Sequence, residues 1–157
     1  MSEVDNLTFL DRVKIQAQVL VPLIKAFEAE IGSDRARQIA KEALHSMVRQ
    51  GYARLREKTS GNPIDLIPIG IDTFAKDALE YEVIGQSTDA FDFNVTKCAY
   101  AEFYKALGEP GLGFLFVCDL DNAMAEGLGS DIDFKRSQTI MEGETHCDFR
   151  FRLRTDV

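Results

Sequence analysis

The sequence has no long apolar run, a deficit of basic residues and only three cysteines. No stretch approaches the roughly 18 uninterrupted apolar residues of a transmembrane helix, so we expect no membrane partner. Lys and Arg number 18 against 26 Asp and Glu, which gives a formal net charge of −8. Nucleic-acid binding needs clustered basic residues that neutralise phosphates, so this charge balance argues against a nucleic-acid partner.

The cysteines indicate a reducing compartment. Cys98, Cys118 and Cys147 are odd in number and widely spaced, which suits free thiols better than a secreted disulfide framework. The N-terminal sequence MSEVDNLTF has neither the basic region nor the apolar region of a secretion signal. We therefore expect a cytoplasmic protein.

Several motifs that hold cofactors or metals are missing. The sequence contains no GxGxxG, Walker, HExxH or GxSxG motif, and no CxxC pair that would hold structural zinc. Asp119 and Asp121 lie about 200° apart on a helix, so both cannot serve one ion. We expect neither a cofactor nor a metal.

The first 60 residues predict a helical layer. Apolar residues recur every three or four positions from Leu10 to Phe27, continue past Pro22 and stop before Gly32. Ser33 is positioned to cap a second helix, whose apolar stripe comprises Ala36, Ile39, Ala40, Ala43, Met47 and Val48. The stretch 64–79 is ambiguous and is either a helix or a lid over the site.

Beyond residue 78 the apolar period changes to two. Residues 79–83 and 91–95 predict a hairpin, and residues 99–107 and 110–127 predict helices. Strands at 132–134 and 147–153 complete the order ααββααββ. The basic outer stripe of the last strand is interpreted as serving solubility and edge protection, with a binding site as the alternative. The prediction is a single α+β domain, 1–157, with a helical layer 1–60 and an antiparallel sheet of about four strands within a core at 79–153.

The helix at 112–126 carries an unusual polar face. At 100° per residue, Cys118, Asp121 and Asn122 fall on the side opposite Leu115 and Leu120. A solvated face normally carries Lys, Glu and Gln, so a thiol, a carboxylate and an amide suggest the wall of a pocket. The alternative is a buried cysteine beside two ordinary surface residues.

Two further features point to chemistry. Arg136 shares the strand parity of Ile132 and Phe134, so a regular strand points it inward, where it needs a carboxylate partner. His146 could activate Cys147 only from the preceding loop, because adjacent strand residues point to opposite faces. His45 is interpreted as an ordinary helix residue.

Four segments together resemble the L-2-amino-thiazoline-4-carboxylic acid hydrolase family. They are Phe93-Asn94-Val95-Thr96-Lys97-Cys98, Cys118-Asp119-Leu120-Asp121, Arg136-Ser137-Gln138-Thr139 and Gly143-Glu144-Thr145-His146-Cys147-Asp148-Phe149-Arg150-Phe151. Their order and spacing match over about residues 79–153. The resemblance implies a small hydrolase that opens a cyclic amidine or amide, such as 2-amino-thiazoline-4-carboxylate, to N-carbamoyl-cysteine.

The resemblance and the residue pattern together suggest a set of roles. Cys118 is a nucleophile or Asp121 a base for water, and either Cys98 or Cys147 could replace Cys118. Arg136 is assigned to the substrate carboxylate and Thr139, Asn122 and His146 to substrate binding. The nearby aspartates would raise the pKa of Cys118, which keeps the water mechanism open.

Two alternatives complete the sequence-based hypothesis. The same cysteine-lined pocket could belong to a non-catalytic module that senses a small molecule or redox state. The first two helices also allow a homo-oligomer, although their apolar stripes are equally well buried within one subunit.

Overall fold

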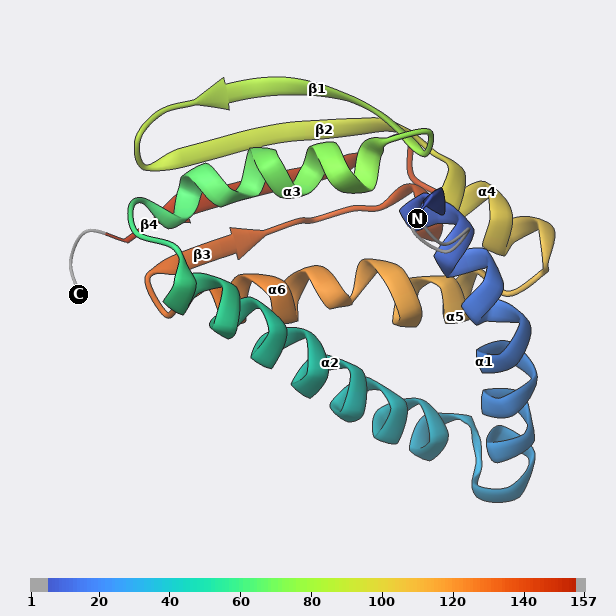
Figure 1. The fold of residues 1–157 in the computed structure, drawn as a ribbon. Helices are drawn as coiled ribbons and strands as arrows, with labels where there is room; N and C mark the ends of the chain where they lie inside the picture. The colour runs from blue at the N-terminus through green and yellow to red at the C-terminus, as the bar shows by residue number, and fades with distance from the viewer. Residues whose placement is uncertain (1–5, 155–157) are drawn as a thin grey trace.

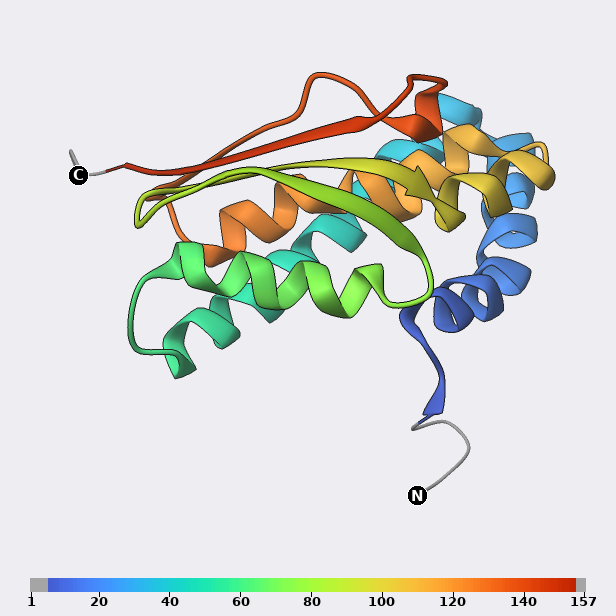
Figure 2. The same ribbon diagram turned by 90° about the horizontal axis from the view of Figure 1, so that it is seen from above.

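A four-stranded antiparallel sheet with helices on one face organises residues 6–154, the part of the chain that the computed structural model describes (Figures 1 and 2). The strands are β1 (Leu79–Gln86), β2 (Ala90–Cys98), β3 (Ile132–Lys135) and β4 (Cys147–Leu153). Their order in the sheet is β1-β2-β4-β3. The predicted α+β class with an antiparallel sheet of four strands is confirmed.

Alternation along the central strands builds the main core. On β2, Phe91, Phe93 and Val95 are buried. Phe93 is the register partner of Phe149 on β4, and their rings stack with centroids 4.6 Å apart. Because strand side chains alternate between faces, this one face carries an aromatic layer that helices must cover.

The basic outer face of β4 does not protect a sheet edge, contrary to the prediction. β4 lies between β2 and β3 in the sheet. Arg152 instead pairs with Asp92, and Arg150 donates to Asn94 Oδ1 at 2.9 Å. These side chains tie β4 to β2 across the solvent-facing side, which period-two alternation alone does not reveal.

Two long helices form the predicted N-terminal layer. α1 (Phe9–Ile31) begins with a reciprocal capping box between Thr8 and Asp11 and continues through Pro22. α2 is Ser33–Lys58. The predicted Ser33 cap is wrong: Gly32, at φ +85°, occupies the cap position between the helices. No helix in residues 6–154 is long and apolar enough to cross a membrane.

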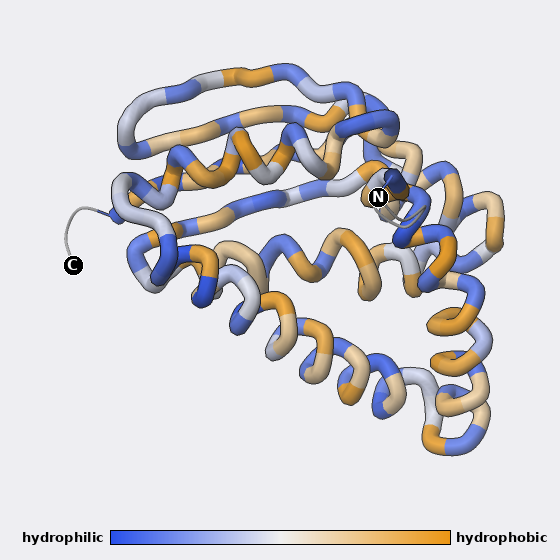
Figure 3. Tube along the Cα trace, in the orientation of Figure 1, coloured by the Kyte–Doolittle hydropathy of each residue, from blue (hydrophilic) through white to orange (hydrophobic). Residues whose placement is uncertain are grey.

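The burial of residues on α1 and α2 also differs from what their apolar spacing predicts. Apolar residues recur along both helices (Figure 3), yet Ala36 is the buried residue of α2. Ile39 and Met47, expected on the apolar stripe, are 45% and 61% exposed. Phe27 on α1 is 50% exposed. Periodicity locates an apolar face but does not show that a partner covers it.

The ambiguous stretch after residue 63 is helical. A short 3-10 turn (Pro63–Asp65) leads into α3 (Leu66–Ala75). Ile64, Ile67 and Ile71 are buried in the same core as Phe91 and Phe93. α3 therefore packs on the aromatic face of the sheet, where Figure 1 shows it lying along the strands.

The long helix predicted after Pro110 is interrupted. The segment comprises α5 (Pro110–Gly113), a π-helical turn η3 (Phe114–Cys118) and α6 (Leu120–Leu128), preceded by α4 (Ala99–Ala106). The Asp119 N–H donates to the Phe114 carbonyl at 2.8 Å, five residues back rather than four. The wider turn rotates the following side chains around the helix axis. A helical wheel drawn at 100° per residue therefore misplaces some residues of the predicted polar face.

α6 packs tightly on α2. A Cβ on Gly127 of α6 would lie 2.5 Å from the Arg49 carbonyl oxygen and 2.8 Å from Tyr52 Cβ. Real Cβ atoms do not approach a backbone oxygen so closely, so only glycine fits this contact. The close approach fixes α6, and with it the polar residues at its N-terminal end, against α2.

We predict that Gly127→Ala lowers the free energy of unfolding by about 1–3 kcal/mol, because the methyl group forces α2 and α6 apart. Gly51→Ala, in α2 with no atom within 4 Å of its added Cβ, is the matched control. That change should be neutral or stabilise by up to about 1 kcal/mol. Urea unfolding followed by circular dichroism measures both, and equal effects would contradict the packing argument.

Candidate functional site

An ion pair between Arg136 and Asp121 forms the centre of the candidate site. Arg136 directly follows β3, and its side chain is 6% exposed. Its Nη1 donates to Asp121 Oδ2 at 2.5 Å, and its Nη2 donates to the Cys118 carbonyl at 2.9 Å. Asp121, in the first turn of α6, keeps 29% exposure. The pair thus has a buried cation and a carboxylate that still reaches solvent.

Aromatic rings enclose the guanidinium. Its central carbon lies 5.2 Å from the ring centroid of Phe149, 5.7 Å from that of Phe134 and 6.0 Å from that of Phe114. Rings at this distance attract a cation and exclude water. With less screening by water, the charge of Arg136 acts strongly on Asp121.

Three free thiols surround this pair. Cys118 ends the π-helical turn and is buried, and Cys147 begins β4 and is also buried. The Ile140 N–H donates to Cys147 Sγ at 3.2 Å. Cys98, half-buried, caps α4, where the Ala101 N–H donates to its sulfur at 3.4 Å.

Electrostatics links these residues. Burial raises the pKa of Cys118 far above its usual range, and the charge of Asp121 raises it further. Burial raises the pKa of Cys147 to about 11, and the pKa of Cys98 is also raised by burial. Each thiol also feels the charge of Asp121. We call Cys98, Cys118, Asp121, Arg136 and Cys147 the thiol–carboxylate cluster.

Asp121 is itself perturbed. Burial raises its pKa to about 6, and the nearby Arg136 limits that rise. A carboxyl group with such a pKa exchanges protons close to neutral pH, which an ordinary aspartate does not. At pH 7 the cluster therefore holds protonated thiols and an ionised Asp121.

Three of the predicted substrate-binding residues bond to other partners. Thr139 is buried and caps a 3-10 turn (Ile140–Glu142), with its hydroxyl donating to Glu142 Oε2 at 2.7 Å. Asn122 is exposed, and its amide lies 3.4 Å from Asp119 Oδ1. His146 lies in the loop before β4, as an active histidine would require, and its ring contacts the Gln138 amide at 3.0 Å. Their roles toward a substrate stay predictions.

A second buried carboxylate escaped the sequence argument. Asp119 is 7% exposed, and its Oδ2 lies 3.0 Å from His45 Nε2 and 2.9 Å from Lys41 Nζ. His45 thus has a carboxylate partner, a contact that its position on the helix did not predict. The available clue was that Lys41 and His45 lie four positions apart on α2, one turn of the same face. The π turn aims Asp119 at that face, and its presence is not readable from the pattern.

Tyr52 of α2 also belongs to this neighbourhood. Burial raises its pKa, and the charge of Asp121 raises it further. The tyrosine thus remains protonated at neutral pH on the α2 side of the cluster.

Within residues 6–154, no group of three or more His, Cys, Asp or Glu side chains has the geometry to hold a metal ion.

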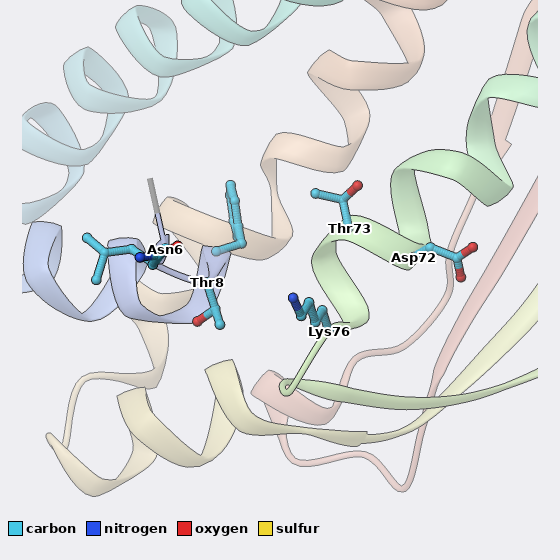
Figure 4. Close-up of a pocket in the computed structure, with 7 residues that line it drawn as sticks. Asn6, Thr8, Asp72, Thr73 and Lys76 are labelled. Carbon is cyan, nitrogen blue, oxygen red and sulfur yellow. The ribbon is translucent and has the colours of Figure 1, made fainter. Parts of the chain in front are cut away.

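One cleft of about 500 Å³ lies between the start of α1 and the end of α3, with Asn6 and Thr8 on one side and Asp72, Thr73 and Lys76 on the other (Figure 4). Another, of about 470 Å³, lies between α1 and α4. Neither is lined by the thiol–carboxylate cluster.

A sequence model of the L-2-amino-thiazoline-4-carboxylic acid hydrolases matches residues 12–151, which include the whole cluster. The chain belongs to this family. The family name points to hydrolysis, and no curated protein matches the chain.

Two solved structures are distantly similar to the chain. The phenol-responsive sensory domain of the transcription activator PoxR, crystallised with phenol, is 15% identical, with a TM-score of 0.48 over 85% of this chain and 72% of that one. The Fe(II) unliganded H-NOX protein from K. algicida is 14% identical, with a TM-score of 0.45 over 90% of this chain and 75% of that one.

We predict that the three thiols differ in reactivity. With iodoacetamide at about pH 7.5, native protein should be alkylated slowly at Cys98, while Cys118 and Cys147 stay unmodified, because burial keeps them protonated and inaccessible. In denaturant all three should react. Peptide mass spectrometry locates the adducts, and rapid native labelling of Cys118 would contradict the pKa ordering.

Proposed function

We propose that this chain is a ring-opening hydrolase in which Asp121 activates water toward a cyclic amidine such as 2-amino-thiazoline-4-carboxylate. The observation that carries the proposal is the geometry of Asp121, a carboxylate that is held by the buried Arg136 at 2.5 Å and still reaches solvent, and its surroundings raise its pKa to about 6. A general base is most effective when its pKa lies near the working pH. Membership of the hydrolase family supports the reaction class.

The cluster favours water over a thiolate as the nucleophile. Cys118 is 9% exposed, and both burial and Asp121 raise its pKa. The thiolate is the reactive form of cysteine, so a thiol that stays protonated at neutral pH is a poor nucleophile. The same argument applies to Cys147, with its pKa of about 11.

The proposed reaction conserves atoms and charge. Asp121 takes one proton from water as the water oxygen bonds to the ring carbon between nitrogen and sulfur, and the electron pair of the carbon–nitrogen double bond moves to the ring nitrogen. The new hydroxyl group gives its remaining proton to that nitrogen, and the carbon–sulfur bond breaks with sulfur taking the electron pair. The proton on Asp121 returns to that sulfur as the carbonyl forms. The sum is one water added, giving N-carbamoyl-cysteine, and Asp121 is regenerated as the carboxylate.

Arg136 acts in this proposal as a positioning residue. It was expected to bind the substrate carboxylate, but both of its terminal nitrogens are engaged, one with Asp121 and one with the Cys118 carbonyl. Substrate binding by Arg136 would require exchange of Asp121 for the substrate. Holding Asp121 ionised and oriented requires no exchange.

A second candidate function is a non-catalytic binding module. The observation that favours it is that burial keeps Cys118 and Cys147 protonated, which leaves the cluster without a thiolate nucleophile. Such a module would bind the same ligand class without turnover.

We predict that Asp121→Asn lowers kcat on L-2-amino-thiazoline-4-carboxylate by about a hundredfold or more, the range expected for loss of a general base. Glu126→Gln, on the same helix but exposed and paired with Arg49, should retain full activity. The assay follows new thiol and the mass of N-carbamoyl-cysteine, using chelator-treated protein at substrate excess. Equal activity of Asp121→Asn and wild type would exclude Asp121 as the base, and ligand binding without turnover by the wild type would favour the binding module.

We also predict a pH profile set by Asp121. A base works only when deprotonated, so kcat/KM should rise with pH through about 6 and level off above it. Arg136→Gln removes the charge that lowers this pKa, so the inflection should move to higher pH, and Arg136→Lys should move it back toward the wild-type value.

Cys118→Ser should change the rate by less than about tenfold, whereas a loss similar to that of Asp121→Asn would indicate a thiol nucleophile.

A further inference from the structure

One face of α1 is apolar and open to solvent. Five residues spaced by four, which we call the α1 stripe, are about half exposed or more: Ile15 51%, Val19 66%, Leu23 48%, Phe27 50% and Ile31 49%. The buried residues Leu10, Val13, Ala17 and Ile24 lie on the inward side of the same helix. A run of this length is unusual on a surface that meets only water.

The charges on this face indicate what covers it. Arg12 and Glu30 are exposed and lie 18 residues apart, five full helical turns, so they point in the same direction about 27 Å apart. At 100° per residue, that direction falls between those of Val19 and Leu23. The face therefore carries a positive charge at one end, a negative charge at the other and apolar residues between them.

Such a face complements itself when two copies run antiparallel. A two-fold axis near residue 21 places Arg12 opposite Glu30 of the second copy, Ile15 opposite Phe27 and Val19 opposite Leu23. The series 12, 16, 19, 23, 26, 30 alternates steps of four and three, the spacing by which one helix packs against another. Within one copy the ion pairs of α1 involve Lys25 and Glu28, which leaves Arg12 and Glu30 without a partner among the described residues.

The neighbouring surface extends the contact. The cleft of about 470 Å³ between α1 and α4 lies directly beside the stripe, with Gln18 and Pro22 on one wall and Phe103 and Leu107 on the other. Leu107 is 49% exposed. Side chains from a second copy would enter an already apolar recess rather than meet a flat helix.

We propose that the chain forms an antiparallel homodimer through the α1 stripe. The partner is a second copy because the charges at the two ends are opposite and equal in number, so two copies of the same face satisfy each other. A parallel arrangement would place Arg12 against Arg12 and Glu30 against Glu30.

The test is sedimentation velocity on the full chain from about 1 to 100 µM. The wild type should sediment as a dimer, and Leu23→Glu should give a monomer at all concentrations. Ile69→Glu, on α3 and 65% exposed, is the matched control and should remain dimeric. Both substituted residues are exposed, so circular dichroism should show an unchanged fold. A wild-type monomer at about 100 µM, or a Leu23→Glu dimer, would overturn the proposal.

Charge reversal tests the antiparallel pairing itself. Arg12→Glu or Glu30→Arg alone creates two like-charge contacts per dimer and should weaken association by about tenfold. The double variant Arg12→Glu with Glu30→Arg restores both contacts and should dimerise within about threefold of wild type. If both single variants associate more weakly and the double variant does not regain wild-type association, Arg12 and Glu30 do not face each other in the dimer.

Discussion

The candidate site depends on a cation buried among phenyl rings. Arg136 joins the end of β3 to the start of α6 by bonding Asp121 and the Cys118 carbonyl. Removing the carboxylate would leave the guanidinium without a partner in a poorly solvated place, which is costly. The aromatic layer of the sheet and the tight packing of α6 on α2 hold this pair in place, so the fold and the proposed chemistry share the same contacts.

The features that could be predicted from the sequence are those set by residues close together in the chain. Period-two alternation located β1, β2 and β4, and period-four spacing located α1 and α2. Strand parity also gave the inward direction of Arg136 and its need for a carboxylate. Tertiary packing makes Asp121 that carboxylate. Sequence spacing alone left open whether the protein or a ligand supplied it.

The misses share a cause, which is that periodicity carries no information on irregular turns or on neighbours. The π turn before Asp119 turns this residue toward His45 and Lys41, a contact invisible to a regular wheel. The place of β4 inside the sheet is set by strand order, which alternation does not encode. The exposed stripe of α1 has the same apolar spacing as a buried one, and the two differ only in that nothing between residues 6 and 154 covers the exposed one.

The cluster draws its members from distant parts of the chain, namely the end of β2, the turn before α6 and the start of β4. Contacts between such distant segments exist only once the tertiary fold has closed the chain between them, at a cost in loop-closure entropy. Before they form, the thiols sit in water with ordinary acidity, and afterwards burial suppresses their ionisation. Oxidants and electrophiles would then damage newly made or unfolded chains while sparing finished ones, so completing the fold is also the chain's chemical protection.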